Sequence, residues 1–399
     1  RPQRNMYNKD ETASPTVSTD ALMMTMLIDA WEKRDVGSAD VVGAYLHADL
    51  EDFTLIKYEG ESVDILCKVN PEWAELVVVE NGKKVLYLQL LKALYGCVQS
   101  ALLWYELFTT TLQGFGFELN PYDACVANKT INGKQCTIAW YVDDNKISHV
   151  DSVVVTKVIS MIEEKFGKMT VTRGKKHTFL GMGIDFNDDG RTSISMKGYL
   201  VEAIDDFDGD IIKSAATPAR RNLFDIDEDC KRLSAQRSDK FHSIVMKLLY
   251  VAKRGRPDIL LPISFLCTRV SKSNEHDWSK LRRVLEFLRG TLDDVIILGA
   301  NDMRRMNTWV DASYAVHEDM KSHTGGAISF GWGAMMCKST KQKLNTKSST
   351  EAEVVGTSDF LPSNIWAQMF LEAQGYGLDE NKFHQDNKSA MSLETNGRK

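Results

Sequence analysis

The first half of the chain alternates between helical and strand-like patterns of apolar residues. Apolar positions at a 3.6-residue period predict three helices, over residues 20–34, 99–112 and 155–166. Ser18 precedes the first helix and can cap it. The inward face of the second helix is expected to hold Leu103, Leu107 and Leu112, and that of the third Val155, Val158, Ile159, Ile162 and Phe166.

Strands are predicted where β-branched and aromatic residues gather between turn residues. They are expected over residues 40–45, in short runs within 60–90 such as 76–79 and 85–88, on both sides of 141–144, and as a pair at 179–184 and 192–196. The flanks of Tyr141-Val142-Asp143-Asp144 alternate apolar and polar residues, and Asp-Asp-Asn is typical of turns. This stretch therefore predicts a hairpin with two carboxylates at its tip.

The second half of the chain changes character twice. Helical periodicity dominates from about 205 to 300, with helices predicted over 240–252 and 274–289 and Gly290 as a C-cap. Strands are then predicted at 307–314, 325–331 and 334–338, before a long helix at 351–374 and a short strand at 382–385. This order predicts a helical segment followed by an α/β unit.

Length and composition limit the class of protein. The 399 residues exceed one ordinary core and predict two or three domains of a globular protein. Neither a run of 18 apolar residues nor a charged-then-apolar leader occurs, so neither a membrane span nor secretion is predicted. Seven scattered cysteines without a Cys-x-x-Cys pair argue against a disulfide framework or structural zinc, and favour a reducing compartment.

The net charge of −6 argues mildly against a nucleic-acid partner, which would need Lys and Arg. Two local basic clusters soften this conclusion. One holds Lys338, Lys341, Lys343 and Lys347 without an acid among residues 338–347, and the other holds Lys253, Arg254 and Arg256. Each cluster can be an ordinary solvated face or a phosphate contact.

Two adjacent carboxylates at a hairpin tip are costly unless a cation, usually a divalent metal, lies beside them. If the strand that begins at Asp40 lies next to the hairpin, Asp40, Asp143 and Asp144 converge. Three carboxylates can hold two Mg²⁺ ions roughly 3.5–4 Å apart. The alternatives are a surface turn for Asp143-Asp144 and a helix-to-strand turn for Asp40.

A second group of acids lies in the last quarter of the chain. Asp311 is an isolated carboxylate on an apolar strand, and Asp386 follows the last predicted strand. Glu351 and Glu353 lie near the start of the long helix, where acids are favoured in any case. Taken singly, Asp386 is equally explained as a helix cap.

The order of these motifs resembles the reverse transcriptases of copia-type (Pseudoviridae-like) LTR retrotransposon Pol polyproteins. Asp40-Val41-Val42-Gly43-Ala44-Tyr45 is similar to the first palm motif, and Leu94-Tyr95-Gly96-Cys97-Val98-Gln99 to the stretch beside the incoming nucleotide. Tyr141-Val142-Asp143-Asp144 matches the catalytic hairpin, and Phe179-Leu180-Gly181-Met182 resembles the primer grip. The resemblance extends over roughly residues 15–399 and includes a connecting segment at Leu248–Ala252 and Arg256–Ile259.

The resemblance implies a role for each matching position. Asp40 and Asp143 would bind both catalytic metals, two Mg²⁺ or Mn²⁺ ions, with Asp144 in support. Substrate contacts are implied for Tyr45, Gln99 and Tyr141. Tyr45 would be the steric gate that excludes a 2′-hydroxyl, Gln99 would contact the nucleotide, and Tyr141 would lie near the primer terminus. The alternatives are a core position for Tyr45 and a helix N-terminal role for Gln99.

The second group of acids resembles the ribonuclease H domain that follows reverse transcriptase in the same elements. The matching metal-binding acids are Asp311, Glu353 and Asp386. Glu353 is preferred to Glu351 because the family's glutamate is followed by small or apolar residues. The implied reaction is two-metal hydrolysis of the RNA strand of an RNA–DNA hybrid, whose backbone residues 338–347 would grip.

The implied fold is α+β, a right-hand polymerase followed by an α/β ribonuclease H-like domain. Fingers and a ferredoxin-like palm would span residues 1–205, a helical thumb or connection 206–302, and the ribonuclease H-like domain 303–399. The implied partners are an RNA template, a DNA primer, the RNA–DNA hybrid, dNTPs and other Gag or Pol products, in a virus-like particle in the cytoplasm or the nucleus. No membrane partner is implied.

The resemblance is incomplete at both ends. Only Arg1 and Arg4 lie near the place where the family's fingers carry basic residues, and the fourth ribonuclease H acid has no candidate before Lys399. The chain is therefore expected to be a piece of a longer Pol polyprotein. The alternative functions are a catalytically inactive relic that keeps only the fold and nucleic-acid binding, and an unrelated two-metal nuclease or nucleotidyltransferase.

Overall fold

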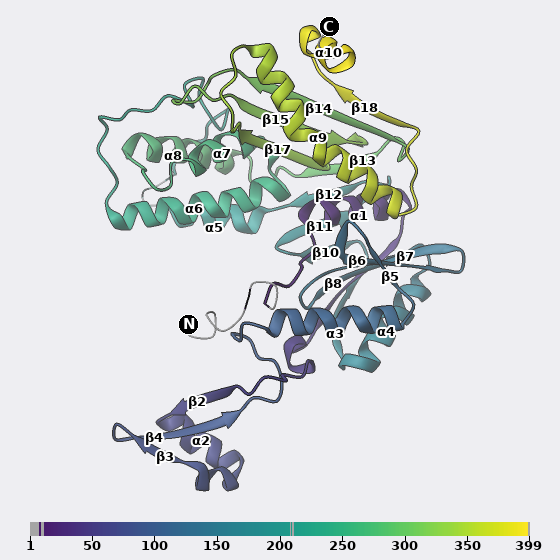
Figure 1. Cartoon of the computed structure of the whole chain (residues 1–399), viewed down its shortest axis with the longest axis vertical. Helices are drawn as coiled ribbons and strands as arrows, with labels where there is room; N and C mark the ends of the chain where they lie inside the picture. The colour runs from purple at the N-terminus through teal and green to yellow at the C-terminus, as the bar shows by residue number, and fades with distance from the viewer. Residues whose placement is uncertain (1–7, 9–11, 208, 210, 398–399) are drawn as a thin grey trace.

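The strands of the chain form four sheets within the described residues. The computed structural model describes residue 8 and residues 12–207, 209 and 211–397, so Arg1 and Arg4 lie outside the described residues. The largest sheet and its helices occupy the centre of Figure 1, with a small lobe below and the second half of the chain above.

The largest sheet has six antiparallel strands in the order β5-β6-β7-β8-β1-β9. Their bounds are Glu118–Asn120, Asp123–Ile131, Lys134–Tyr141, Asp144–His149, Asp35–Val41 and Met169–Arg173. Helices α3 (Ser100–Gly114) and α4 (Ser152–Phe166) lie below the sheet in Figure 1, and α1 (Thr19–Trp31) lies above it. Ser18 caps α1 as predicted, and all five predicted inward positions of α4 are buried.

The buried face of α3 differs by one position from the prediction. Leu103 and Leu107 are only half-buried, whereas the helix packs through Trp104, Phe108 and Leu112. The ring of Phe166 in α4 lies 5.1 Å from that of Trp104 and 5.9 Å from that of Phe108, between centroids. Aromatic rings bury more apolar area than leucine, so they take the inner face.

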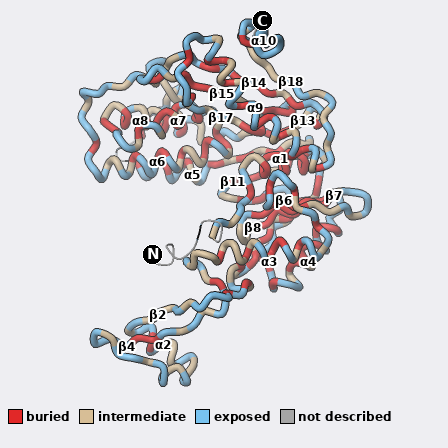
Figure 2. The backbone as a smooth tube through the Cα atoms, in the orientation of Figure 1, coloured by how far each residue is buried: buried red, intermediate tan, exposed pale blue. Residues whose placement is uncertain are grey.

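A small lobe projects from the central body. It holds the sheet β2-β4-β3, helix α2 and a short 3₁₀ helix, over Leu55–Glu59, Lys83–Gln89, Val78–Glu80, Glu61–Val69 and Pro71–Leu76. The pattern predicted only strands in this region, so α2 was missed. Figure 2 shows that the lobe is mostly exposed, and within residues 51–91 only Val63, Val85 and Leu86 are buried.

A five-stranded sheet joins the three segments that were predicted as domains. Residues 1–205 supply its first three strands, 206–302 the fourth and 303–399 the fifth, in the order β10-β11-β12-β13-β16. These strands span Lys176–Phe179, Met182–Phe186, Thr192–Ser195, Ile296–Ala300 and Gly331–Trp332. The predicted strand 179–184 is instead a hairpin, because Leu180 and Gly181 turn the chain with φ of 49° and 72°. Strand β13 was missed in a segment where helical periodicity dominates.

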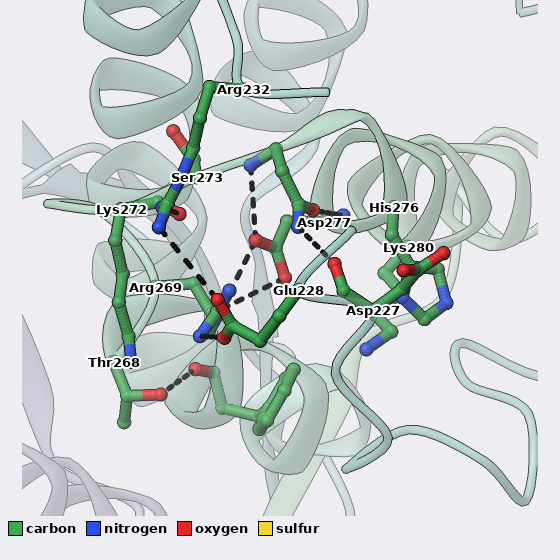
Figure 3. A network of polar contacts seen from close by, with 12 residues as sticks. Asp227, Glu228, Arg232, Thr268, Arg269, Lys272, Ser273, His276, Asp277 and Lys280 are labelled. Carbon is green, nitrogen blue, oxygen red and sulfur yellow. Dashed lines mark hydrogen bonds and ion pairs between the residues drawn. The ribbon is translucent and has the colours of Figure 1, made fainter. Parts of the chain in front are cut away.

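The helical segment contains a buried ion pair (Figure 3). Its helices α5, α6, α7 and α8 span Lys197–Asp205, Ala235–Arg254, Leu260–Cys267 and Glu275–Gly290, with a short 3₁₀ helix at Pro257–Ile259. Gly290 is the last residue of α8 rather than the predicted C-cap, which is Thr291. At the start of α8, Asn274 accepts the N–H of Asp277 at 3.0 Å and donates its own N–H to that carboxylate at 3.2 Å. Asp277 also pairs with Arg269 at 3.1 Å, and both side chains are buried.

Asp277→Ala is expected to lower the free energy of unfolding by about 3–5 kcal/mol, because the buried Arg269 keeps only its longer contact with Glu228 at 3.7 Å and the capping box is lost. Urea denaturation followed by circular dichroism measures the change. The matched control is Asp293→Ala, which removes an exposed acid paired with Lys197 at 2.6 Å and should change stability little. Equal losses in the two variants would contradict a structural role for the buried pair.

The last unit is a four-stranded sheet with α9 across one face (Figure 1). The strands run in the order β17-β15-β14-β18, and β18 is parallel to β14 while the other pairs are antiparallel. The elements of this unit lie close to the predictions. They are β14 (Arg305–Ser313), β15 (His323–Ser329), β17 (Met336–Lys341), α9 (Ser349–Ala373), β18 (Glu380–His384) and α10 (Lys388–Asn396). Among the helices of the described residues, none has the length and apolar character that crossing a membrane requires.

Candidate active sites

The first three candidate acids converge on the six-stranded sheet. Asp40 lies on β1 opposite Asp144 at the start of β8. The strand predicted over 40–45 therefore begins earlier and ends at Val41, which makes Asp40 a strand residue and the turn alternative wrong. The N–H of Val41 donates to the carbonyl of Asp143 at 3.1 Å, so the hairpin tip is fixed to the end of β1. Tyr45 follows on the 3₁₀ helix Ala44–His47.

The hairpin tip consists of Val142 and Asp143, because the residues on either side already pair in the ladder. Val142 has a positive φ of 58°, whereas the φ of Asp143 is not positive. This combination is typical of a type II′ turn, in which the first central position favours glycine. Trp104 donates its indole N–H to the Val142 carbonyl, and Asn145 donates its amide to the Asp143 carbonyl, each at 2.7 Å. These bonds hold a backbone conformation that costs of order 1–3 kcal/mol in a residue other than glycine.

The three carboxylates repel one another. Burial, and then the charge of Asp143, raises the pKa of Asp40. Burial, and then the charges of Asp143 and Asp40, raises the pKa of Asp144. A divalent cation between them would relieve this repulsion, and Mg²⁺ prefers carboxylate oxygens, so the donor set fits the predicted metal.

Tyr95 contacts the same cluster, although the motif comparison assigned it no role. Its hydroxyl donates to Asp143 Oδ2 at 2.9 Å, and its ring centroid lies 4.3 Å from that of Tyr45. Main-chain bonds that tie residues 91–93 to residues 48–50 bring it there. Burial, with the bond to Asp143, raises the pKa of Tyr95 to about 12, so the hydroxyl keeps its proton at neutral pH. The sequence offered one indication of a role for Tyr95, namely its position within the Leu94–Gln99 motif.

Gln99 and Tyr141 lie at the ends of elements that border the cluster. Gln99 occupies the N-cap position of α3, as the structural alternative expected, yet its side chain makes no capping bond. Tyr141 ends β7 and is 37% exposed. Tyr45 is half-buried against Tyr95 and packs beside the core. Contacts of these side chains with a nucleotide stay predictions.

The second set of acids converges more tightly. Carboxylate oxygens of Asp311 on β14, Glu353 on α9 and Asp386 after β18 lie within 4.8 Å of one another. Within the part of the chain that the structure describes, no other group of metal-ligating side chains meets this criterion. Burial, aided by the charges of the two aspartates, raises the pKa of Glu353. This oxygen-rich set fits a divalent cation.

The structure separates the two candidate glutamates. Glu351 accepts the N–H of Lys347 at 2.6 Å, which is a role at the start of the helix. Glu353 is buried and accepts the Gln385 amide at 3.3 Å beside the two aspartates. The helix-cap alternative for Asp386 is wrong, because Asn387 caps α10.

A cleft of about 760 Å³ opens beside the second cluster. Asp311 and Asp386 line it, together with Trp309 and His384, whose rings stack with centroids 4.9 Å apart. Helix α7 contributes Leu261 to the lining of the cleft. The cleft therefore brings both acids and an aromatic stack to one open surface.

The predicted basic stretch 338–347 is only partly available to a ligand. Lys338 bonds to Ser363, and Lys341 pairs with Asp319 at 2.7 Å. The remaining two lysines are exposed, at Lys343 and Lys347. Contact of this stretch with a nucleic-acid backbone stays a prediction.

Comparison with known proteins decides the family. The family described as reverse transcriptase (RNA-dependent DNA polymerase) matches residues 2–221, which is more than half of the chain. This chain belongs to that family.

Curated relatives of this reverse transcriptase are transposon Pol polyproteins. The Retrovirus-related Pol polyprotein from transposon TNT 1-94 of Nicotiana tabacum is 26% identical over 99% of the chain and 29% of its own length. That from transposon RE2 of Arabidopsis thaliana is 24% identical over 94% of the chain and 24% of its own length. These relatives confirm the predicted resemblance to copia-type Pol polyproteins. The chain spans less than a third of either relative's length.

A solved structure supports the reverse transcriptase fold. The foamy viral protease-reverse transcriptase in complex with RNA/DNA hybrid has a TM-score of 0.50, with 12% identity over 90% of this chain and 39% of that one. At this identity the likeness concerns the fold alone. It agrees with the reverse transcriptase part of the predicted α+β fold, and the ribonuclease H-like domain stays a prediction.

If Asp40, Asp143 and Asp144 bind Mg²⁺ as predicted, Tyr95→Phe is expected to strengthen that binding roughly three- to tenfold, because Asp143 then has no hydrogen bond from Tyr95 to give up when the metal binds. Isothermal titration of the nucleic-acid-free protein with Mg²⁺ measures the affinity. The control is Tyr105→Phe, whose hydroxyl bonds the Ala124 carbonyl at 3.3 Å instead of an acid. Weaker binding in Tyr95→Phe would mean that the hydroxyl helps to hold the metal site together.

Proposed function

We propose that this chain is an RNA-directed DNA polymerase that transfers nucleotides from dNTPs to a primer 3′-hydroxyl, and that its last unit is a ribonuclease H. The polymerase proposal rests on one observation in a member of this family. Asp40 on β1 lies opposite Asp144 at the start of β8, and Asp143 at the hairpin tip is bonded to the end of β1. The ribonuclease proposal rests on the second acid group, Asp311, Glu353 and Asp386.

In the proposed transfer, the primer 3′-oxygen forms a bond to the α-phosphorus, and the bond from that phosphorus to the bridging oxygen breaks, so that pyrophosphate leaves with the electron pair. The hydroxyl proton passes to solvent water. Asp40 and Asp143, supported by Asp144, would hold two divalent cations, which lower the pKa of the hydroxyl and neutralise the leaving pyrophosphate. The Trp104 bond fixes the hairpin tip, so Asp143 is positioned before substrate binds.

Three side chains are proposed to contact the substrate. Tyr45, supported by the ring of Tyr95, would fill the space that a ribose 2′-hydroxyl needs. Gln99 at the start of α3 would contact the nucleotide, and Tyr141 at the end of β7 would lie near the primer terminus.

The second site is proposed to hydrolyse the RNA strand of an RNA–DNA hybrid. Asp311, Glu353 and Asp386 would hold two divalent cations that activate the attacking water and stabilise the leaving oxygen. The open cleft and the stacked rings of Trp309 and His384 offer a surface for the hybrid. The foamy viral protein of similar fold was itself solved in complex with an RNA/DNA hybrid.

The remaining parts of the proposal concern organisation and partners. Fingers and palm are placed at residues 1–205, thumb or connection at 206–302, and ribonuclease H at 303–399. The partners are an RNA template, a DNA primer, their hybrid and dNTPs, with other Gag or Pol products in a particle of the cytoplasm or nucleus.

Primer extension tests the polymerase proposal. The purified chain, given poly(rA)–oligo(dT), dTTP and Mg²⁺ or Mn²⁺, is expected to extend the primer, and EDTA should stop the reaction. Folded protein that binds the hybrid in a filter assay but extends no primer with either metal would instead support an inactive relic.

Tyr45→Ala is expected to raise ribonucleotide incorporation relative to deoxynucleotide incorporation roughly 10- to 100-fold, because the 2′-hydroxyl no longer meets the ring. The ratio of kcat/KM for rUTP and dTTP on the same primer measures it. Tyr45→Phe keeps the ring and is expected to keep the selectivity. An unchanged ratio in the alanine variant would remove Tyr45 from the gate.

A further inference from the structure

Among the described residues, three hydrogen bonds join the ribonuclease H-like unit, residues 303–399, to the polymerase body, residues 1–205. Each comes from the last turns of α9 or the residues just after it, and Figure 1 shows this end of the helix near α1 and β7. The partners lie on three separate parts of the body. The bonds are Tyr376 hydroxyl to Glu32 Oε1 at 2.6 Å, Gln135 amide to Gln374 carbonyl at 3.0 Å, and Trp366 indole to Tyr122 carbonyl at 3.1 Å.

Glu32 is connected to strand β8 through a series of buried charged side chains. Arg34 donates to Glu32 at 2.7 Å and lies 3.8 Å from Asp29. Asp29 in turn pairs with Lys146. Arg34, Asp29 and Lys146 are all buried, and Lys146 lies on β8, the strand that begins with Asp144. The contact made by α9 therefore ends a polar network that reaches the strand carrying a candidate catalytic acid.

The same helix carries part of the second site at its other end. Glu353 lies near the start of α9, and Tyr376 lies three residues beyond its end at Ala373. Helix α9 is unbroken from Ser349 to Ala373 although Pro362 lies within it, and an unbroken helix keeps its two ends at a set separation. Attaching one end to the polymerase body therefore orients the Glu353 end, and the acids grouped with it, relative to the hairpin.

We infer that Tyr376 is a positioning residue that, with the Gln135 and Trp366 contacts, sets the separation of the two active sites. It thereby sets the number of nucleotides between the primer terminus and the cut in the RNA. This inference rests on the proposed function. Loss of the Tyr376 hydroxyl leaves all six candidate metal-binding acids in place. It should therefore shift the position of the cut in the RNA while it changes the rate of cleavage little.

The test uses the full chain and a labelled RNA annealed to a DNA primer with a recessed 3′ end. Tyr376→Phe, and more strongly Tyr376→Phe with Gln135→Ala, is expected to broaden or displace the window of cuts measured from that end. Cutting of a hybrid without a recessed end, and primer extension, should stay within about twofold of wild type. The matched control is Tyr87→Phe, which removes an exposed tyrosine bond to Glu80 at 2.9 Å in the small lobe.

Unchanged cut positions in both variants overturn the inference. If the wild type cuts no hybrid, the proposed ribonuclease function fails, and with it the effect on cut spacing. Hydrogen–deuterium exchange then tests separately whether these contacts hold the end of α9 against the polymerase body. Faster exchange at residues 366–376 and 134–141 in the double variant supports it, and unchanged exchange overturns it.

Discussion

Asp143→Asn is expected to reduce primer extension at least about 10³-fold, because cation binding of this kind contributes several kcal/mol to the transition state. Asp143 is central to the first cluster. Its charge raises the pKa of both Asp40 and Asp144, and its Oδ2 accepts the Tyr95 hydroxyl. Asparagine keeps the shape and can still accept from Tyr95, but it lacks the charge that a divalent cation requires.

Single-nucleotide incorporation at saturating dTTP measures this loss. The variant removes a repulsive charge, so its melting temperature should equal or exceed that of wild type, which separates loss of catalysis from loss of fold. The control is Asp189→Asn, at an exposed turn between β11 and β12, which should change incorporation less than about twofold. Incorporation by Asp143→Asn within about tenfold of wild type would remove this residue from the proposed metal site.

The geometry of the hairpin shows what sequence reasoning could and could not reach. The two adjacent acids and Asp40 were recognisable from their motifs, and the resemblance supplied the expectation that they meet. The turn itself was not predictable, because Val142 is a β-branched residue in a conformation that favours glycine. A bond from Trp104, far away in the sequence, stabilises that conformation, and no local pattern records it.

The same limit explains the errors elsewhere. Helix α4 was predicted well because its apolar residues form a single stripe, all of it buried. In α3, leucines and aromatic residues compete for the inner face, and packing against Phe166 decides for Trp104 and Phe108. Tyr95 was overlooked because its contact with Asp143 depends on the path of the segment that carries it. Each of these outcomes depends on tertiary contacts that periodicity does not encode.

Asp311→Asn is expected to reduce cleavage of the RNA strand at least about 10³-fold while primer extension stays within about twofold, because Asp311 and Asp40 lie on strands of separate sheets. The change removes a charge that raises the pKa of Glu353, so this pKa should fall toward its ordinary value. A labelled RNA–DNA hybrid with Mg²⁺ or Mn²⁺ measures the cleavage.

The control for the second site is Glu351→Gln, which alters a neighbouring acid on the same helix. Glu351 accepts the Lys347 N–H, a bond that a glutamine oxygen can also accept, so cleavage should change less than about twofold. Cleavage that survives Asp311→Asn but is lost in Glu351→Gln would reverse the assignment of the two glutamates and remove Asp311 from the site. Loss of cleavage in Asp311→Asn alone would instead assign the cleavage to Asp311 and its neighbours Glu353 and Asp386, because carboxylate oxygens of these three acids lie within 4.8 Å of one another.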